Sequence, residues 1–233
     1  MNRAEGGSHR WFIVALYAVA MAWVEAAAVY YLRSLIGRME PYQPYPLPVV
    51  GGYGEAEVIR EMATLVMLFT VGWLAGATWR CRVGYSAVAF GIWDIFYYVF
   101  LRVMTGWWPK SVLDWDILFL IPLPWWGPVW APVSIALLMI LWGTFMTRTE
   151  RSALASGFRW KSLASGSAGA ALALFVFMAD AIRTADKGTE ALRMMLPVRF
   201  NWPLFCVALG LMAWPVMELA WRGIRSERPV ELR

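Results

Sequence analysis

The sequence is poor in histidine and in cysteine, which limits the metal and cofactor chemistry open to it. Its one histidine, His9, lies in the polar N-terminal segment, and its two cysteines are Cys81 and Cys206. One histidine is too few for a bis-histidine haem or for a zinc site of the usual histidine and cysteine type, so a bound metal would need carboxylate ligands. The cysteines belong to segments expected at opposite ends of the molecule, which argues against a disulfide. We therefore expect no metal site and no cofactor.

Charge is also scarce, and long polar stretches are few. Charged residues make up 16% of the 233 residues and hydrophobic residues 60%, whereas a soluble domain carries about a quarter charged residues. The net charge of +5 does not indicate nucleic acid, because the basic residues are spread over the ends of apolar runs. The sequence lacks a Walker loop, an HExxH motif and a setting for a serine or cysteine nucleophile. Whether the chain is an enzyme stays open.

What the sequence does contain is six apolar stretches, each long enough to cross a bilayer. They predict an all-α integral membrane protein, with residues 1–233 forming a single polytopic membrane domain. Residues 1–28 also have the basic start and apolar core of a signal peptide, but the apolar run continues beyond them and favours an uncleaved helix. The expected transmembrane helices are about 11–33, 57–79, 83–105, 127–146, 164–182 and 203–222.

The distribution of lysine and arginine predicts the orientation. With both termini in the cytoplasm, twelve of the 21 basic residues fall inside and nine outside, which is the direction that the positive-inside rule favours. The reversed topology is the alternative.

A proline- and tryptophan-rich segment, WDILFLIPLPWWGPVWAPV (115–133), precedes the fourth expected helix. Its four prolines exclude a regular helix through its middle, and its tryptophans prefer the membrane interface. We expect it on the outer side, either as a loop that lies on the bilayer or as a lid or floor over an outward-facing cavity.

Two acids, Glu25 and Asp94, lie well inside apolar runs. A charge in hydrocarbon costs about 2.5–3.5 kcal/mol on insertion scales, so each acid is a candidate functional residue. Asp94, Tyr98 and Arg102 follow one another at steps of four and share a face of the third expected helix, and Glu25 and Arg33 stand on a similar face of the first. Burial favours the neutral form of a carboxyl and a neighbouring arginine favours the charged form, so acids placed this way can bind and release protons or cations.

These residues, with acids from two other segments, predict a pocket in the outer leaflet. Glu61 lies near the outer end of the second expected helix, and Asp116 enters from the proline-rich segment. The simpler interpretation is that the acids bridge helices for architectural reasons, with Glu61 in an ion pair. In the pocket interpretation the ligand- or proton-binding residues are Glu25 and Asp94 as ligands, Tyr98 as hydrogen-bond donor, Arg33 and Arg102 as charge-tuning partners, and Glu61 and Asp116 as rim acids.

Small residues four positions apart indicate close helix packing in two places. They are Gly72 and Gly76 in GWLAG, and Gly166 and Ala170 in the fifth expected helix. Such pairs allow two helices to approach closely, either within the chain, with a second copy or with a membrane partner.

The text GIWDIFYYVFL, followed by WDILFLIPLPWWGPVWAPV, resembles a group of uncharacterised bacterial multi-pass membrane proteins. The segments EAAAVYYLR and REMATLVML fit the same pattern, and the resemblance covers about residues 20–140. It implies a setting in the bacterial inner (cytoplasmic) membrane, and it carries no activity or ligand.

The most favoured function is binding or transport in an outward-facing pocket. The ligand would be protons, or a small molecule that is cationic or amphiphilic and lipophilic. One alternative is a membrane enzyme that uses Asp94 or Glu25 as general acid on a lipid or isoprenoid, which a long hydrophobic crevice reaching Asp94 would favour. The other is an accessory subunit of a membrane complex, which the absence of a cavity at the acids would favour. The bilayer itself is an expected partner, and nucleic acid is not.

Overall fold

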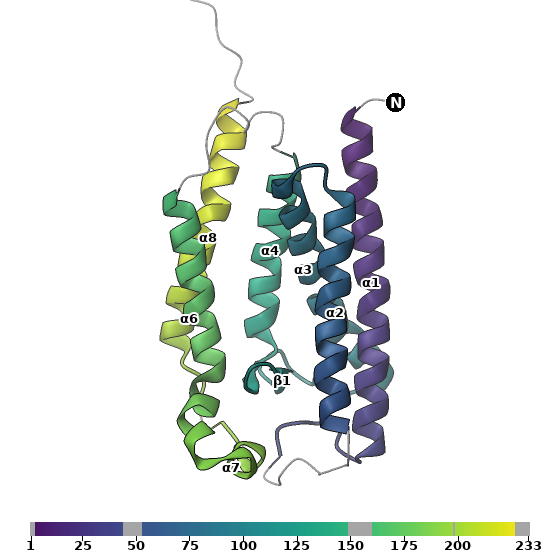
Figure 1. The fold of residues 1–233 in the computed structure, drawn as a ribbon, viewed down its shortest axis with the longest axis vertical. Coiled ribbons are helices and arrows are strands. Elements are labelled where there is room, and N and C mark those ends of the chain that lie inside the picture. The colour runs from purple at the N-terminus through teal and green to yellow at the C-terminus, as the bar shows by residue number, and fades with distance from the viewer. Residues whose placement is uncertain (1–2, 44–52, 149–159, 198, 227–233) are drawn as a thin grey trace, which may run out of the picture.

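Helices make up most of the structure, a computed structural model that describes residues 3–43, 53–148, 160–197 and 199–226. Within these ranges six helices are long and apolar enough to cross a membrane, so the predicted number of spans is confirmed. With the labels of Figure 1, the helices are α1 (Arg3–Leu35), α2 (Tyr53–Ala75), α3 (Trp79–Thr105), α4 (Trp130–Arg148), α6 (Trp160–Thr184), the 3-10 helix η1 (Ala185–Lys187), α7 (Thr189–Met194) and α8 (Trp202–Ser226).

The turn between α2 and α3 lies four residues earlier than predicted. The sequence analysis ended the second helix at residue 79 and began the third at 83, whereas α2 ends at Ala75 and α3 begins at Trp79. Thr78 caps α3, since its side chain accepts a hydrogen bond from the backbone N–H of Cys81 at 3.4 Å. A threonine at this position satisfies an N–H group that the helix itself leaves free. Cys81 therefore lies in the first turn of α3 and not in a loop.

A short antiparallel hairpin connects α3 and α4. Its strands are β1 (Trp115–Phe119) and β2 (Trp125–Pro128). Aromatic and β-branched residues favour strands, and Pro122 and Pro124 fall in the connection, where no backbone N–H is needed for pairing. The sequence analysis excluded a regular helix here but predicted no strand, so the all-α description is corrected by this two-stranded sheet.

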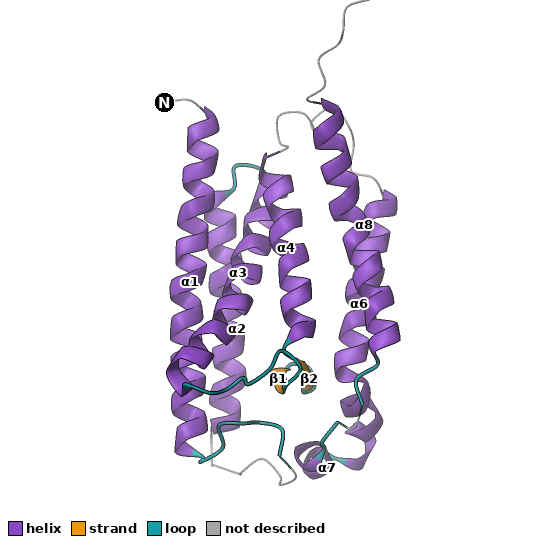
Figure 2. Ribbon diagram, turned by 180° about the vertical axis from the view of Figure 1, so that it is seen from behind, coloured by secondary structure: helices purple, strands orange, loops and turns teal. Residues whose placement is uncertain are grey.

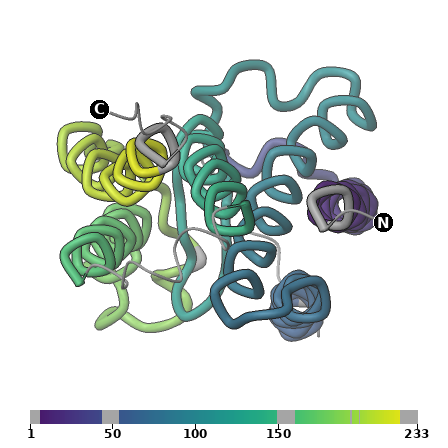
Figure 3. Tube along the Cα trace, turned by 90° about the horizontal axis from the view of Figure 1, so that it is seen from above, coloured from purple at the N-terminus to yellow at the C-terminus, as the bar shows by residue number. Residues whose placement is uncertain are grey.

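Helix α3 lies at the centre of the bundle and packs against α1, α2 and α4. Helices α6 and α8 pack along each other and meet the rest through α4 and β2. Seen along the bundle, this pair lies on one side of α4, and α1 and α2 lie toward the opposite side (Figure 3). The start of α1 and the end of α8 lie at one end of the bundle, and the hairpin and α7 lie at the other, which we call the hairpin end (Figures 1 and 2).

The glycine pair of GWLAG packs within the chain. Gly72 lies against Ser86 of α3, and Gly76 lies against the backbone of Arg82, with no room for a Cβ at either position. Close approach of this kind is what small residues allow in membrane helices. Both glycines thus pack against α3.

The second predicted seam, Gly166 and Ala170 of α6, lies against α8 and an apolar groove. A Cβ at Gly166 would lie 3.2 Å from Pro215 of α8, and Ala170 lines an apolar groove between the two groups of helices. Gly169 is packed more tightly against α8, because a Cβ there would lie 2.7 Å from the carbonyl oxygen of Ala208. A homo-oligomer or membrane partner at the predicted positions stays a prediction.

Gly143 provides a test of the α3–α4 interface. A Cβ at this position would overlap the carbonyl oxygen of Gly84 and lie 2.9 Å from Val88 Cγ2. We expect Gly143→Ala to lower the free energy of unfolding by about 1–3 kcal/mol, the usual cost of overpacking a well-packed contact. Gly210→Ala is the matched control, because a Cβ there meets nothing within 4 Å and alanine is the better helix former. Thermal unfolding of the purified protein in detergent measures both, and equal melting temperatures for the two variants would contradict the interface.

Candidate functional site

Helix α1 brings two charged side chains into the protein. Glu25 is 6% exposed and Arg33 is 8% exposed, two helical turns apart on the face that packs against the bundle. Three alanines on that face, Ala18, Ala22 and Ala26, are fully buried. The small side chains let α1 lie close to α3. Both charged groups must therefore find partners inside the protein.

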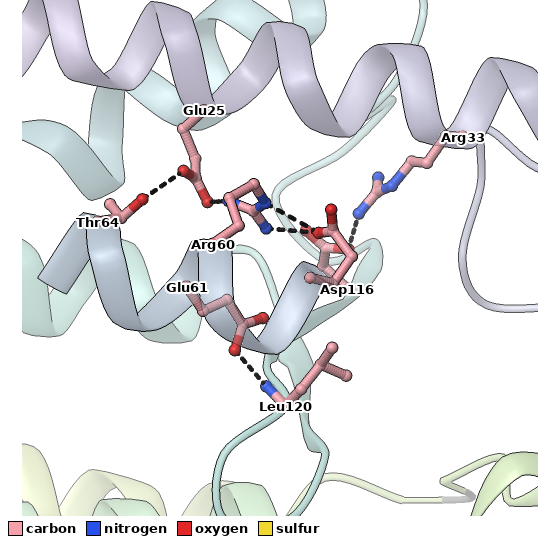
Figure 4. A network of polar contacts seen from close by, with 8 residues as sticks. Glu25, Arg33, Arg60, Glu61, Thr64, Asp116 and Leu120 are labelled. Carbon is pink, nitrogen blue, oxygen red and sulfur yellow. Dashed lines mark hydrogen bonds and ion pairs between the residues drawn. The ribbon is translucent and has the colours of Figure 1, made fainter. Parts of the chain in front are cut away.

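The partner of Glu25 is Arg60 of α2. Arg60 Nη1 donates to Glu25 Oε1, and Thr64 Oγ1 donates to Glu25 Oε2 at 2.9 Å (Figure 4). Arg60 also donates to Glu57 Oε2 through Nε at 2.9 Å and Nη2 at 2.7 Å. One guanidinium thus joins two carboxylates, and this network links α1 to α2.

The partner of Arg33 is Asp116 of β1. Arg33 Nη2 donates to Asp116 Oδ1 at 2.6 Å, and Asp116 is completely buried. The guanidinium also donates to the carbonyl oxygen of Met39 at 3.3 Å and lies 4.5 Å from the ring centroid of Trp108, within the range of a cation–π contact. Burial raises the pKa of the Asp116 carboxyl, and the adjacent Arg33 guanidinium opposes that rise. This pair ties the hairpin to α1.

A second polar contact ties the hairpin to α2. The backbone N–H of Leu120, just after β1, donates to Glu61 Oε2 at 3.0 Å (Figure 4). Glu61 is 8% exposed. Leu120 lies beyond the paired residues of the strand, so its backbone N–H needs a hydrogen-bond acceptor other than the neighbouring strand, and the Glu61 carboxylate provides it. The end of β1 is therefore held over the site by a residue of the second helix.

Asp94 of α3 differs from the other acids of the site, because no described residue donates a hydrogen bond to its carboxylate, whereas Asp116, which also has one buried oxygen without a partner, pairs with Arg33 through the other. Asp94 is 8% exposed, and Asp94 Oδ2 is buried without a hydrogen-bond partner among the described residues. A buried polar atom left unpaired costs about 1–3 kcal/mol, and more when it carries charge. Such an atom is unusual in a folded protein and calls for a functional explanation.

These side chains surround a cavity of about 180 Å³ at the hairpin end, between α1, α2, α3 and β1. We call it the carboxylate cavity. An apolar cavity of about 150 Å³ holds benzene, so this one has room for a small molecule. The charged residues that line it are Glu25, Arg33, Arg38, Glu57, Arg60, Glu61 and Asp94, and the aromatic ones are Trp93, Tyr97, Tyr98 and Phe119.

Arg38, which follows α1, is the third arginine of the lining. Its Nη2 donates to the carbonyl oxygens of Pro41 at 2.8 Å and Gln43 at 3.1 Å. Burial lowers the pKa of its guanidinium, which nonetheless stays charged because arginine titrates far above neutral pH. Arg38 thus stabilises the chain that leaves α1 at the mouth of the site.

Five of the seven predicted site residues line the carboxylate cavity. They are Glu25, Arg33, Glu61, Asp94 and Tyr98.

The other two lie elsewhere. Asp116 lies beside the lining as the partner of Arg33. Arg102 is exposed and does not line the cavity. At about 100° per residue, the eight positions from Asp94 to Arg102 turn the side chain by about 80°, whereas Leu101 stays on the buried face. The predicted tuning role of Arg102 therefore has no support in the geometry.

Sequence reasoning missed Arg60 and Tyr97. Arg60 pairs with Glu57 three residues before it, and this spacing was a usable signal that α2 carries a charge pair. That Arg60 also reaches Glu25 depends on the helix packing and had no signal in the sequence. Tyr97 follows Asp94 by three residues, a spacing that places both on one side of α3 and was a second usable signal.

The fold and the site define a class. Six apolar helices and charged groups that pair inside the bundle make this chain a multi-pass membrane protein. Over the described residues, no group of three or more histidine, cysteine, aspartate or glutamate side chains is arranged to hold a metal ion. Comparison with protein-family models, with curated proteins and with solved structures finds no match in any of the three.

Proposed function

We propose that the chain is a bacterial inner-membrane protein that binds a small cation, or protons, in the carboxylate cavity. The observation that carries the proposal is the Asp94 carboxylate, which lines a cavity of about 180 Å³ and has no partner in the part of the chain that the structure describes. An acid that is buried, unpaired and next to an open space gains a partner when a cation or proton binds there. Intramembrane acids mark ion pathways and proton relays in membrane proteins, so we propose transport of the ligand as the use of this site.

The charge balance around the cavity supports a positive ligand. Four carboxylates line the cavity and Asp116 lies behind Arg33, whereas the lining contains three arginines. With all groups ionised, this cluster of described residues carries two formal negative charges in excess. In surroundings of low dielectric constant an uncompensated charge is costly. A bound cation or proton removes part of that cost.

The orientation that we propose follows the positive-inside rule, with both termini in the cytoplasm. The start of α1 and the end of α8 lie at the same end of the bundle, and the hairpin lies at the other (Figure 1). The carboxylate cavity is lined by hairpin residues and therefore belongs to the hairpin end. In this orientation the cavity belongs to the outer leaflet, and the ligand enters from outside the cell.

The separation of two cavities favours binding over the enzyme alternative. A hydrophobic crevice that reaches Asp94 is what a lipid or isoprenoid substrate would need. The apolar groove, about 580 Å³ and lined by residues such as Phe69, Trp142 and Val216, shares no lining residue with the carboxylate cavity. The accessory-subunit alternative is disfavoured by the presence of a cavity at the acids.

Replacement of Glu25 tests the proposal. We expect purified wild-type protein to be stabilised in thermal unfolding by at least one of sodium, magnesium, methylammonium and tetramethylammonium, or by a decrease in pH, because a ligand that binds the native state raises its stability. Glu25→Gln removes one negative charge from the lining and is expected to raise the half-saturating concentration at least tenfold. Glu40→Gln is the control, since Glu40 pairs with Lys110 outside the lining. The proposal fails if none of these probes stabilises the wild type, or if Glu25→Gln responds like Glu40→Gln.

A further inference from the structure

We infer that the ligand of the carboxylate cavity is a small alkylated ammonium ion rather than an inorganic cation; this inference rests on the proposed function and names its ligand class. It depends on a feature that cation binding in general does not require. Aromatic rings line the cavity together with Asp94, the lining acid whose carboxylate has no partner among the described residues.

The aromatic residues come from two elements that meet at the cavity. Trp93 immediately precedes Asp94 on α3, Tyr97 and Tyr98 follow it within about one turn, and Phe119 belongs to β1. The rings of Trp93 and Tyr97 are stacked with centroids 6.3 Å apart, and those of Tyr97 and Tyr98 meet edge to face at 5.0 Å. Phe119 lies 6.3 Å from Trp93 between ring centroids. The four rings therefore form one continuous wall.

A wall of aromatic rings next to a carboxylate is the arrangement that recognises alkylated ammonium ions. The face of an aromatic ring attracts a cation that lies within about 6 Å of the ring centroid. Aromatic rings also pack well against the methyl groups of an alkylated ammonium ion, which a hydrated metal ion lacks. The carboxylate of Asp94 supplies the opposite charge. Inorganic divalent ions need several oxygen ligands in a tight shell, and among the described residues the acids are not arranged for this.

The size of the cavity sets an upper limit on the ligand. About 180 Å³ is slightly more than the cavity that holds benzene. Methylammonium and tetramethylammonium fit this space, whereas tetrabutylammonium is too large for it. Size selection thus provides a readout on the wild-type protein that does not depend on any variant folding.

Calorimetric titration of the purified full-length protein at constant ionic strength tests the inference. We expect tetramethylammonium to bind at least tenfold more tightly than sodium and magnesium, and tetrabutylammonium to show no saturable binding. Tyr97→Leu, which removes a ring, is expected to weaken tetramethylammonium at least tenfold, whereas Tyr97→Phe, which keeps the ring, changes it by less than about threefold. Tyr31→Leu is the matched control, since Tyr31 is 69% exposed and outside the lining.

The outcomes separate this inference from the proposed function. Preference for sodium or magnesium over tetramethylammonium, or unchanged tetramethylammonium affinity in Tyr97→Leu, overturns the inference. If sodium or protons bind in that case and binding requires Asp94, the proposed function stands. If no cation or proton binding requires Asp94, both are wrong.

Discussion

Replacement of Asp94 by asparagine is expected to weaken cation binding at least a hundredfold while the protein still folds. Two unit charges 4 Å apart attract each other by about 4 kcal/mol at an effective dielectric constant of 20, and about 1.4 kcal/mol corresponds to a tenfold change in affinity. Asp94 is the lining carboxylate whose Oδ2 has no partner in the described part of the chain. Its negative charge is therefore the one most available to a ligand.

The same substitution is expected to raise the melting temperature of the ligand-free protein. Asparagine has nearly the shape of aspartate, and it removes a buried charge without leaving an opposite charge unpaired. Stability gained where function is lost is typical of residues kept for binding. Asp180→Asn is the control, since Asp180 pairs with Arg183 at 3.3 Å outside the cavity lining. Calorimetric titration and thermal unfolding measure the two effects, and wild-type affinity in Asp94→Asn would exclude Asp94 as a ligand.

Removal of the Asp116 carboxylate is expected to cause the largest loss of stability of any single replacement at the site. Asp116→Ala leaves the Arg33 guanidinium, 8% exposed, without its charged partner. Breaking a buried ion pair from one side typically costs about 3–5 kcal/mol, because the remaining charge stays buried and uncompensated. We expect a loss of this size in thermal or denaturant unfolding of the protein in detergent.

A double variant distinguishes this cause from a simple loss of packing. In Arg33→Met/Asp116→Leu both charges are gone and most of the volume is kept, so the free energy of unfolding should return to within about 1–2 kcal/mol of the wild type. A single variant as stable as the wild type, or a double variant no better than Asp116→Ala, would show that the pair does not hold the hairpin to α1.

The helices were predictable because their signal is local, and the partners of the charges were not. A long apolar segment in lipid can adopt few structures, because each of its backbone polar groups needs a hydrogen-bond partner within the protein. The match of Glu25 to Arg60 and of Arg33 to Asp116 depends on how α1, α2 and β1 pack. No spacing along the chain contains that information.

The position of Arg102 shows a second limit of sequence reasoning. Steps of four residues keep two side chains on one face, but each step adds about 40° of rotation. After two steps Arg102 has left the face of Asp94 and is exposed. Tyr98, one step away, remains buried. Over two steps the outcome depends on the surrounding packing, because Glu25 and Arg33 of α1, which are also eight residues apart, both stay buried and line the cavity.

The hairpin was half predictable. Four prolines excluded a helix, and this was correct, but nothing in the sequence required that Trp115–Phe119 pair with Trp125–Pro128. Strand pairing depends on the partner strand and on burial more than on intrinsic preference. The hairpin matters to the site because it supplies Asp116 and one wall of the cavity.

The short turn between α2 and α3 limits how these two helices can move against each other. Only residues 76–78 separate them, and Gly72 and Gly76 pack closely against Ser86 and Arg82. Sliding of α2 along α3 would break these contacts, so we expect the two helices to move together at this end of the bundle. We therefore expect a motion that admits or releases a ligand to displace α1 or the hairpin, and with them the Arg33–Asp116 pair.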